Sequence, residues 1–461
     1  MENERKFDKV VNLAKTRGFV FPSSTIYGGL SSIHDYGPLG VELKNNIKQA
    51  WQDFMLARRD VVGLDSGILM HPKIWEASGH IQGFSDPLVD CKKCKTRFRA
   101  DHLLESKGLK PDHFHEKPEE IKNIKCPDCG GDLTDIRQFN LMFKTFIGPV
   151  EEDANQIYLR PETAQGIYVN FLNVKDSMRL KMPFGIAQIG KAFRNEITPG
   201  NFIFRMREFE QMEMQYFVHP DKTEEVFANW QQLRMDWYLS LGINPDNLRF
   251  REHDEDELAH YAKRALDIEY KFAFSGEEPF KELEGVHHRG EWDLSRHQEY
   301  SGEKMTVKDE DNNDYIPNVI ETSGGVDRAF LAFLFDAYTE IDGGRTTTTE
   351  SNKEKEVVLK LHHRLAPIKI AILPLSKKEP LANKAKEIYD DLVKSYRIQY
   401  DETASIGKRY RRQDEIGTPY CVTVDFESLE DNQVTVRDRD TMEQERIAIA
   451  DLESYFKEKL T

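Results

Sequence analysis

The segment from Phe193 to Glu213, FRNEITPGNFIFRMREFEQME, constrains this chain more than any other part of the sequence. Two runs that favour strands flank a Thr-Pro-Gly-Asn sequence at 198–201, which is typical of a turn. Because strand side chains alternate between faces, an unbroken second strand would place five side chains on one face: Arg205, Arg207, Phe209, Gln211 and Glu213. Such a face could bind a nucleoside triphosphate and an amine. A solvated hairpin with cross-strand ion pairs is the alternative.

The order of residues in this hairpin resembles motif 2 of the class II aminoacyl-tRNA synthetases. That motif contains Phe-Arg-x-Glu, a loop, and then Arg-x-x-x-Phe, which Arg205 to Phe209 match. The longer string through Glu213 resembles the glycyl-tRNA synthetases in particular. The resemblance covers essentially the whole chain. It implies an enzyme that activates glycine with ATP, forming glycyl-adenylate and diphosphate, and then transfers glycine to the 3′ end of tRNA(Gly), releasing AMP.

Two further segments are similar to the other class II signatures. Pro38 is well placed to begin a helix that reaches about Arg59, and a strand-like run follows over residues 60–70. This unit is similar to motif 1, which builds the dimer interface in the family, so the resemblance implies a homodimer. The segment Ile316–Arg328, IPNVIETSGGVDR, predicts a strand, a glycine break and a helix, as in motif 3. A glycine-rich junction before a helix can approach phosphates closely.

The expected fold class is α+β. The resemblance implies a catalytic domain with an antiparallel sheet flanked by helices, whose two parts cover residues 1–85 and 151–345. Residues 86–150 are polar, carry two C-x-x-C pairs and are expected to form an inserted zinc-ribbon-like module. A linker of low complexity over 346–364 leads to alternating strands and helices over 365–461. This last part is similar to the α/β anticodon-binding domain shared by glycyl, histidyl, prolyl and threonyl synthetases.

Charge, hydropathy and cysteine spacing bear on the partners and the location of the protein. The 461 residues carry a formal net charge of −16, but local basic patches can still bind nucleic acid. One basic run, Lys408, Arg409, Arg411 and Arg412, is either a solvated helix face or a contact for anticodon phosphates. The sequence has no run of 18 apolar residues and a polar N-terminus, so we expect neither a membrane span nor a signal peptide. Cysteine spacing indicates a reducing compartment, and the cytoplasm is the expected location.

The family's chemistry joins two anions, the amino-acid carboxylate and the α-phosphate of ATP, so it requires positioning and fixed positive charge. The resemblance assigns catalysis to Arg194, at the α-phosphate and carboxylate, and to Arg328, at the γ-phosphate. It assigns adenine stacking to Phe209 and the adenine amino group to Glu196. Glu282 is a candidate Mg²⁺ ligand, since carboxylate and phosphate oxygens are the usual ligands of that ion. The rest of the implied ATP-binding set is Asn195, Phe204, Arg205, Met206, Arg207, Glu208, Leu283, Gly325, Val326 and Asp327.

Glycine offers no side chain to bind, so its selection requires holding the ammonium group and excluding any Cβ atom. Glu162, Glu213 and Glu321 stand in three matched motifs and could form charge-assisted hydrogen bonds with an ammonium group. Steric exclusion is needed because one methylene group is otherwise worth only about 1–3 kcal/mol. The rest of the implied glycine-binding set is Arg99, Phe209, Glu210, Gln211, Met212, Thr322, Ser323, Gly324 and Gly325.

The cysteine pairs Cys91/Cys94 and Cys126/Cys129 have the spacing of a zinc ribbon. Four thiolate ligands would leave no open position on the metal, so a structural Zn²⁺ is expected, with free thiols as the alternative. Members of the family differ in having these cysteines, so their necessity for activity stays open.

Two alternative functions remain at this stage. One is a histidyl, prolyl or threonyl synthetase, and the other is a catalytically inactive, synthetase-like protein that binds nucleic acid. The three glutamates favour glycine, and the presence of Arg194, Arg207 and Arg328 favours activity. The segment HHRGEW at 287–292 departs from the family's Asn-Arg-Thr-Asp form, which leaves the role of Arg289 open. Separately, residues 221–268 are expected to be largely helical.

Overall fold

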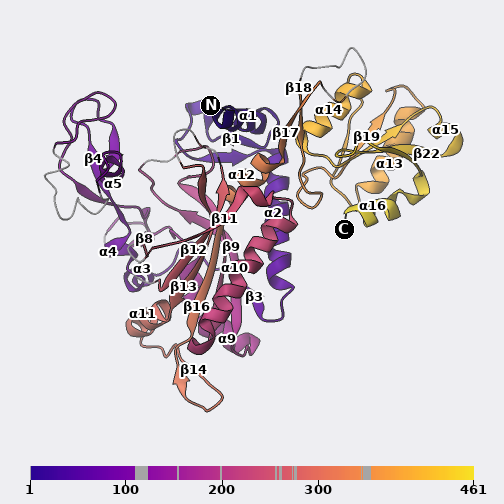
Figure 1. The fold of residues 1–461 in the computed structure, drawn as a ribbon. Coiled ribbons are helices and arrows are strands. Elements are labelled where there is room, and N and C mark those ends of the chain that lie inside the picture. The colour runs from indigo at the N-terminus through magenta and orange to yellow at the C-terminus, as the bar shows by residue number, and fades with distance from the viewer. Residues whose placement is uncertain are drawn as a thin grey trace.

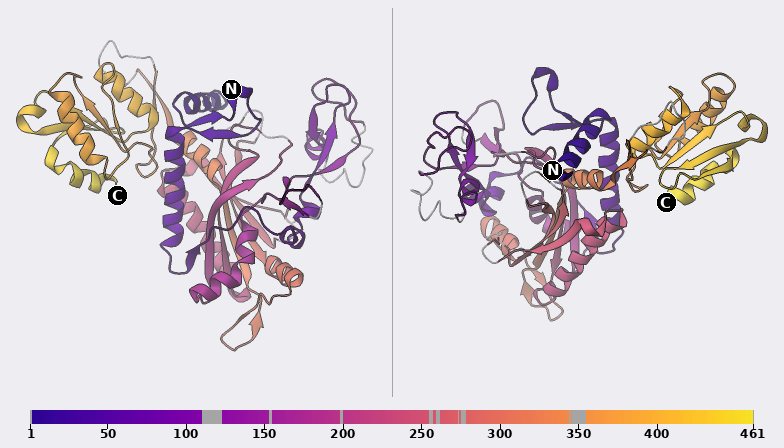
Figure 2. Two further views of the ribbon diagram at one scale, coloured as in Figure 1. Left: turned by 180° about the vertical axis from the view of Figure 1, so that it is seen from behind. Right: turned by 45° about the horizontal axis from the view of Figure 1, so that its top comes forward.

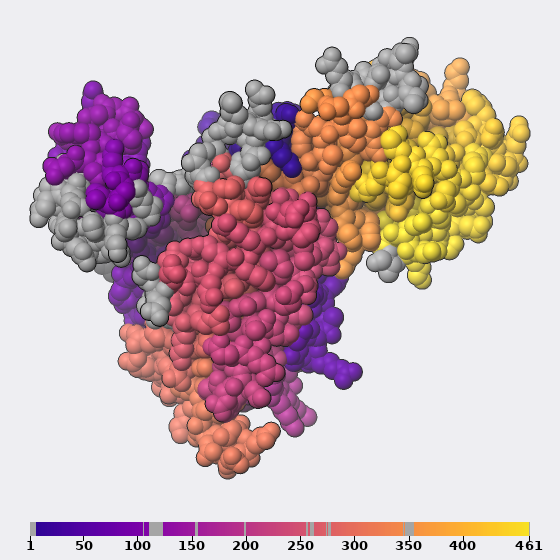
Figure 3. Space-filling model, in the orientation of Figure 1, coloured from indigo at the N-terminus to yellow at the C-terminus, as the bar shows by residue number. Residues whose placement is uncertain are grey.

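The computed structural model describes residues 2–109, 123–152, 155–197, 200–254, 257–258, 262–272, 274, 278–343, 345 and 355–460. Three parts are visible along the chain: a central catalytic body, a small cysteine-containing module and a C-terminal domain (Figure 1). The module and the C-terminal domain project from opposite sides of the central body, as the rotated views and the space-filling view also show (Figures 2 and 3). Among the described helices, none has the length and hydropathy needed to cross a membrane.

The central body is built on one seven-stranded sheet. Its strands, in spatial order, are β11 (Leu248–Glu252), β12 (Arg264–Lys271), β13 (Phe280–Gly290), β16 (Asn318–Gly325), β10 (Glu208–Val218), β9 (Phe184–Phe193) and β3 (Val61–Gly63). Every neighbouring pair is antiparallel except β3 with β9. The antiparallel sheet expected from the resemblance is therefore confirmed. The strand expected over 60–70 is much shorter and covers only β3.

Helices cover this sheet as expected. The bounds are α1 (Glu2–Thr16), α2 (Pro38–Leu56), α8 (Ala164–Val169), α9 (Phe171–Met178), α10 (Thr223–Ser240), α11 (Trp292–Ser301) and α12 (Val326–Ala337). Helix α12 is apolar around most of its circumference, which is typical of a helix buried on all sides, and ten of its twelve residues are buried. Its N-terminus follows Gly325 at the end of β16, so the strand-to-helix junction predicted for motif 3 is present.

The helical expectation for residues 221–268 is only partly right. Helix α10 is present, but β11 and the first part of β12 occupy the rest of this range. In β12, Leu266, Ile268 and Tyr270 alternate with Ala265, Asp267 and Glu269, and the first three belong to the main hydrophobic core. This period-two pattern favours a strand, whereas the acidic residues around it suggested a solvated helix.

Two sides of helix α2 contact different parts of the protein. Lys44 and Lys48, one turn apart, form ion pairs with Glu210, at 2.9 and 3.2 Å between nitrogen and oxygen. On a different stripe, Asn46 donates its side-chain amide to the carbonyl oxygens of Leu365 and Ala366, at 3.1 and 3.0 Å. Glu42, one turn before Asn46, pairs with Arg397 of the C-terminal domain at 3.3 Å. The helix thus joins the catalytic body to the C-terminal domain.

The remaining elements of the catalytic body and the module are short. They are β1 (Val20–Pro22), β2 (His34–Tyr36), α3 (Pro72–Ala77), α4 (His80–Gly83), β4 (Ser85–Asp90), β5 (Arg97–Arg99), α5 (Ala100–Glu105), β6 (Arg137–Asn140), β7 (Lys144–Phe146), β8 (Gln156–Tyr158), β14 (Val307–Lys308), β15 (Asp314–Tyr315), β17 (Tyr338–Asp342) and β18 (Lys355–Leu359). Strands β5, β4 and β6 form the small antiparallel sheet of the module. Residues 346–354 of the expected linker, 110–122 of the expected module and 198–199 of the expected turn lie outside the described residues.

The C-terminal domain has alternating strands and helices, as expected. They are β19 (Ile370–Pro374), α13 (Leu381–Leu392), β20 (Ile398–Tyr400), α14 (Ile406–Ile416), β21 (Tyr420–Val424), α15 (Ser428–Asp431), β22 (Gln433–Asp438), β23 (Gln444–Ala448) and α16 (Leu452–Leu460). The sheet order is β20-β19-β21-β22-β23, parallel over the first three strands and antiparallel beyond. This is the mixed α/β domain predicted for residues 365–461.

The basic run in α14 is not a solvated helix face. Arg409 is buried and donates to the carbonyl oxygens of Pro374 and Asp401. Arg412 binds the Asp401 carboxylate, and Arg411 lies 3.8 Å from the Glu356 carboxylate. Only Lys408 of the four is exposed. The solvated-face alternative is therefore wrong, because three of its charges hold the domain together. The contact with anticodon phosphates stays a prediction.

Candidate active site

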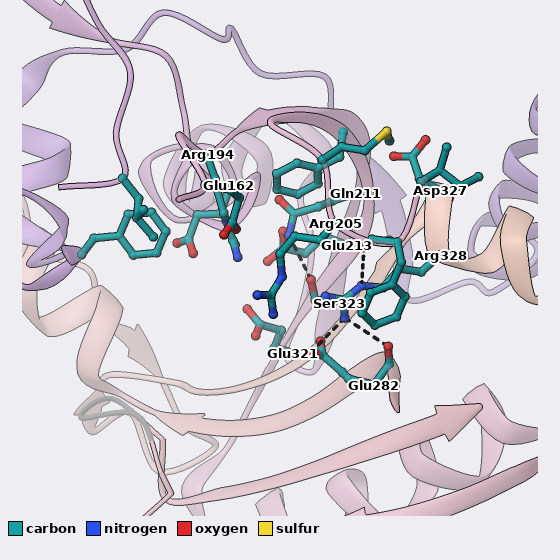
Figure 4. Close-up of a pocket in the computed structure, with 18 of the residues that line it drawn as sticks. Glu162, Arg194, Arg205, Gln211, Glu213, Glu282, Glu321, Ser323, Asp327 and Arg328 are labelled. Atoms are coloured by element: carbon teal, nitrogen blue, oxygen red, sulfur yellow. Dashed lines mark hydrogen bonds and ion pairs between the residues drawn. The ribbon is translucent and has the colours of Figure 1, made fainter. Parts of the chain in front are cut away.

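A cavity of about 440 Å³ opens over strands β10, β13 and β16 of the central sheet (Figure 4). It is lined by sixteen of the predicted residues: Arg99, Glu162, Arg194, Glu196, Phe204, Arg205, Met206, Phe209, Gln211, Glu213, Glu282, Glu321, Ser323, Gly325, Asp327 and Arg328. Motifs 2 and 3 and the segments around Glu162 and Glu282, which are far apart in sequence, therefore meet in one place. Six further lining residues were not predicted to bind substrate: Phe84, Asp86, Leu141, Ile203, His287 and Arg289.

Strand alternation explains much of this lining. Phe209, Gln211 and Glu213 on β10 face the cavity, as the predicted pattern requires. Strand β10 begins only at Glu208, so the pattern does not extend back through Arg207. The Arg207 guanidinium instead donates to the carbonyl oxygens of Ser31 and Glu196, at 2.9 and 3.1 Å. The expectation that Arg207 shares the cavity face is wrong for that reason.

Several predicted residues have side chains outside the cavity. Glu208 pairs with Lys191, and Glu210 pairs with Lys44 and Lys48 behind the strand. Met212, Leu283 and Val326 belong to the hydrophobic core, and Thr322 is fully buried. The other two that do not line the cavity are Asn195 and Gly324. Any contact of these residues with a ligand in this cavity would have to come from their backbone.

The Arg194 guanidinium lies near two aromatic rings. Its guanidinium carbon lies 5.4 Å from the ring centre of Phe84 and 5.3 Å from that of Phe209. Its Nε donates to the carbonyl oxygen of Pro161 at 3.0 Å. The terminal nitrogens of Arg194 form no hydrogen bond with any residue in the described ranges, so they are available to an anion in the cavity.

Arg328 lies on another side of the cavity and pairs with Glu282 (Figure 4). The shortest distance between their charged atoms is 2.9 Å, and Arg328 also donates to the backbone carbonyls of Glu282 and Phe204. The positive charge of Arg328 holds the pKa of Glu282 below its ordinary value. Local desolvation of the carboxyl group opposes this shift, although half of the Glu282 side chain is exposed. An ionised carboxylate at this position fits the oxygen ligands that Mg²⁺ prefers.

Asp327, next to Arg328, has an anchoring role. Its carboxylate accepts a hydrogen bond from the backbone N–H of Glu210 at 2.8 Å and binds the Lys44 ammonium at 2.9 Å. It also accepts a hydrogen bond from the Tyr36 hydroxyl. Asp327 therefore ties the start of α12 to strand β10 and helix α2, next to the arginine predicted to bind ATP.

The three predicted glutamates lie together, but their protonation states differ. Burial would raise the pKa of Glu162, yet His80, Arg289 and Gln165 hold it at about 2. In the same way Arg289 and His287 overcome burial and keep the pKa of Glu321 far below its ordinary value. Burial and the charges of Glu321 and Glu162 raise the pKa of Glu213 well above its ordinary value. The ionised form is thus favoured for Glu162 and Glu321, and the protonated form for Glu213.

Glutamine and serine side chains connect these carboxylates. The Gln215 amide donates to Glu213 at 2.8 Å and to Glu321 at 2.7 Å. The Gln211 amide nitrogen donates to the Ser323 hydroxyl at 3.3 Å, and its oxygen accepts from the backbone N–H of Thr163. Both glutamines extend from β10, so one strand orients the polar groups on this side of the cavity.

The structure also shows what Arg289 does. Its guanidinium forms two hydrogen bonds with Asp293, at 2.7 and 2.9 Å, and one with Glu321 at 3.0 Å. His287 lies 2.7 Å from the other oxygen of Glu321. The i,i+4 rule for helices did not signal the pairing of Arg289 with Asp293, because Arg289 lies on strand β13 and Asp293 in the first turn of α11. The contact of either group with Glu321 had no local signal, because it depends on the pairing of β13 with β16.

Arg99 reaches the cavity from the inserted module. It binds Asp86 at 2.8 Å and Asp101 at 2.6 Å. Burial raises the pKa of Asp86 to about 6, against the opposing charge of Arg99. Glu196 and Arg205 also influence Asp86 electrostatically, so this acidic group belongs to the side of the cavity formed by the motif 2 hairpin.

The four predicted cysteines of the module form one cluster. Their sulfur atoms all lie within 4.8 Å of one another. The backbone N–H groups of Lys93 and Cys94 point at the Cys91 sulfur, at 3.4 Å each. A Cβ atom on Gly131 would lie 3.2 Å from that sulfur and 3.4 Å from Cys129, so the chain turns tightly around the cluster. Four soft donors at this spacing fit a tetrahedral Zn²⁺ site.

Comparisons with known proteins agree with this geometry. Residues 144–338 match the family model described as "tRNA synthetase class II core domain (G, H, P, S and T)", and residues 369–459 match "Anticodon binding domain". The fold is similar to a crystal structure of prolyl-tRNA synthetase from Cryptosporidium parvum complexed with halofuginone and AMPPNP. The TM-score is 0.64 at 16% identity, covering 98% of this chain and 75% of that chain. The fold and the site define a class II aminoacyl-tRNA synthetase.

Sequence relatives specify the family within this class. The chain is 54% identical to the glycine–tRNA ligases of Alkaliphilus oremlandii and Treponema denticola, over its full length and 100% and 98% of theirs. It is 55% identical to that of Geobacillus kaustophilus, over 98% of both chains. The chain belongs to the glycine–tRNA ligase family. This membership decides against the histidyl, prolyl and threonyl alternatives and against a protein that has lost its activity.

The protonated state of Glu213 predicts the pH dependence of stability. A carboxyl group whose pKa is raised by folding stabilises the folded state below its unfolded pKa, and this contribution is lost as the pH rises through the folded pKa. Glu213→Gln removes that titration. Without glycine, we expect the variant to melt at a higher temperature than the unmodified protein at pH 7.5, with the difference shrinking toward pH 4.5. Thermal unfolding followed by circular dichroism across this range tests the prediction.

Glu208→Gln is the matched control, because Glu208 lies on the same strand with its side chain outside the cavity. Its melting temperature should not show the same pH-dependent gain. An unchanged difference between Glu213→Gln and the unmodified protein from pH 4.5 to 7.5 would contradict the protonation assigned to Glu213.

Proposed function

We propose that this chain activates glycine with ATP to glycyl-adenylate and transfers the glycine to the 3′ end of tRNA(Gly). The single observation that carries the proposal is the meeting of two arginines with three glutamates in one cavity. These residues are Arg194, Arg328, Glu162, Glu213 and Glu321. The names of its relatives support the same activity.

Arg194 is proposed to bind the α-phosphate of ATP and the attacking carboxylate. The rings of Phe84 and Phe209 and the carbonyl oxygen of Pro161 contact its guanidinium group, so little reorganisation is needed as charge develops on phosphorus. Adenine is proposed to stack on Phe209, with its amino group bound by Glu196, since both side chains line the same cavity as Arg194. Bond formation between the carboxylate oxygen and phosphorus then expels diphosphate.

Arg328 is proposed to bind the γ-phosphate. Its ion pair with Glu282 keeps the guanidinium at the cavity wall. Glu282 is proposed as a ligand of Mg²⁺, which would neutralise phosphate charge when bound. Asp327 is proposed to act through its anchoring contacts with Lys44 and Glu210 rather than by touching ATP.

Glu162, Glu213 and Glu321 are proposed to bind the glycine ammonium. Two of these carboxylates are already ionised, and the arriving positive charge would favour loss of the proton from Glu213. Around them the cavity wall is polar: Gln211, Ser323, Arg289 and His287 line it. A methyl group on the substrate would meet these polar groups instead of an apolar pocket, which supports selection of glycine over alanine.

A homodimer is proposed from the N-terminal region. Four large apolar side chains around the β1–β2 connection are exposed: Phe21, Ile26, Tyr27 and Leu30, with 88% of Ile26 and 87% of Tyr27 accessible. Val41 on helix α2 is also exposed. Contiguous exposed apolar residues usually mark an interaction surface. Helix α2 belongs to the unit that resembles motif 1, so a second copy of the chain is the proposed partner.

We further propose the domain division 1–85, 86–150, 151–345, 346–364 and 365–461, which places the three-stranded sheet of the module outside the catalytic domain. The module's cysteines are proposed to bind one structural Zn²⁺. Thiolate ligands require a reducing environment, which supports a cytoplasmic location. The C-terminal domain is proposed to contact the anticodon of tRNA(Gly), in keeping with its family match.

Substrate choice is the first test of the proposal. ATP–pyrophosphate exchange measured with each of the twenty amino acids should proceed with glycine alone, because polar groups line the cavity where a substrate side chain would lie. Exchange with alanine or serine at comparable efficiency would contradict the assignment.

The two catalytic arginines should differ in their kinetic effects. Arg194→Ala removes a charge from the developing anion, so kcat should fall by about 10²–10³-fold. Arg328→Ala should also reduce activity, with part of the loss appearing as a higher KM for ATP. Steady-state exchange kinetics with native circular dichroism would check both, and Arg251→Ala on the edge strand β11 provides a control. Near-normal exchange by a folded Arg194→Ala or Arg328→Ala variant would show that its assigned role is wrong.

Zinc should be present at about one ion per chain. Cys126→Ser should remove it and make residues 86–150 more susceptible to proteolysis, since a closed thiolate site stabilises its surroundings. Exchange activity should persist. Elemental analysis and limited proteolysis measure these effects, and Cys421→Ala, at a buried cysteine in β21, should leave the zinc content unchanged. Protein purified without chelators that contains no zinc would refute the site.

A further inference from the structure

The short helix α4 and the residue after it, Phe84, lie beside the cavity where the inserted module begins. We propose that His80 and Phe84 are positioning residues that hold the two groups assigned to opposite ends of glycine. His80 holds Glu162, assigned to the ammonium group, and Phe84 holds Arg194, assigned to the carboxylate. This inference rests on the proposed function and deepens it.

His80 is fixed through both nitrogens of its ring. Nδ1 lies 2.8 Å from the Ser78 hydroxyl oxygen, and Nε2 lies 3.4 Å from one carboxylate oxygen of Glu162. The other oxygen of Glu162 accepts a hydrogen bond from the Gln165 amide at 3.0 Å. The His80 ring also makes an edge contact with Trp75, with 5.5 Å between ring centres. Glu162 is therefore oriented through both oxygens by groups that are themselves fixed.

Phe84 provides one side of the clamp around Arg194. Its ring centre is 5.4 Å from the Arg194 guanidinium carbon, and the Phe209 ring is 5.3 Å from the same atom. A guanidinium over an aromatic ring gains about 0.5–1 kcal/mol at exposed sites and more when water is excluded. With Nε bound to Pro161, the plane of the Arg194 fork is set before substrate arrives.

The two positioning residues are rigidly connected. They are four residues apart, which places them on one side of a helical turn, and their ring centres are 5.3 Å apart. The Asn140 amide, at the end of β6, donates to the backbone carbonyls of His80 and Ile81 at 3.2 and 3.1 Å. The backbone N–H of Leu141 donates to the Phe84 carbonyl at 3.0 Å. Helix α4 and Phe84, bound to the end of strand β6, thus set the relative placement of Glu162 and Arg194.

A purely structural role is the competing explanation, because Phe84 also packs near the small core around Trp75. The two explanations differ in kinetics. A variant that only loses packing would be less stable, but the KM for glycine, the KM for ATP and kcat would not change independently of one another. Positioning predicts that each residue affects the substrate group held by its partner.

The test is glycine-dependent ATP–pyrophosphate exchange with the full-length protein carrying His80→Leu, His80→Gln, Phe84→Leu or Phe84→Tyr. We expect His80→Leu to raise the KM for glycine about tenfold with little change in the KM for ATP, since Glu162 loses one fixed contact. His80→Gln retains a donor and should recover part of the loss. Phe84→Leu should lower kcat about tenfold because Arg194 loses one side of its clamp, and Phe84→Tyr, which keeps the ring, should restore it.

Gln82→Ala is the matched control, since this exposed residue lies on α4 two positions from each of the others. It should leave both KM values and kcat unchanged. The proposal is overturned if the leucine variants change only the melting temperature, or if they alter both KM values equally and the conservative variants restore nothing. Absence of glycine-dependent exchange in the unmodified protein would instead overturn the proposed function, and this inference with it.

Discussion

Burying several carboxylates at one end of an antiparallel sheet is the physical constraint around which this site is built. An uncompensated buried charge is costly, so each carboxylate must be ionised against a fixed cation or remain protonated. Arg289 and His287 meet this requirement for Glu321. The charge of Arg289 also lowers the pKa of Glu162, which His80 and Gln165 contact. Glu213 forms no ion pair with a described cation, and burial beside Glu321 and Glu162 raises its pKa well above the ordinary value, which favours the protonated form. The free site is therefore short of one positive charge, which an amino-acid ammonium would supply.

The register of the sheet brings these groups together. Strand β16 lies between β13 and β10, so Glu321 stands opposite His287 on one side and Gln215 on the other. Glu213 pairs across the ladder with Ser323. A shift of one residue in either pairing would turn these side chains to the other face of the sheet. The register of the backbone hydrogen bonds thus decides which side chains face the substrate site, just as it decides which face the hydrophobic core.

Sequence patterns predicted the parts that depend on local order. Strand alternation placed Phe209, Gln211 and Glu213 on the cavity face, and the Gly-Gly break before α12 marked the junction of motif 3 correctly. The same reasoning failed at Arg207, because a strand's starting residue depends on the loop that precedes it, and loop geometry has a weak local signal.

Long-range contacts could not be predicted from the sequence. The basic run in α14 was expected to be open to solvent because charged residues usually are. Arg409 is nevertheless buried and donates to the carbonyl oxygens of Pro374 and Asp401. Asp86 and Phe84 gave no sign of facing the cavity, since their positions depend on how the inserted module meets the central body. Residues 221–268 were misjudged because acidic character outweighed the period-two pattern of β12.

Helix α2 has a consequence for how the molecule can move. One stripe of this helix holds Asp327 and Glu210 through Lys44, and another holds the carbonyls of Leu365 and Ala366 through Asn46. A helix of this length is nearly rigid, so any rotation or translation of α2 moves Lys44 and Asn46 together. A movement of helix α2 would therefore displace the C-terminal domain and Asp327, the neighbour of Arg328, together.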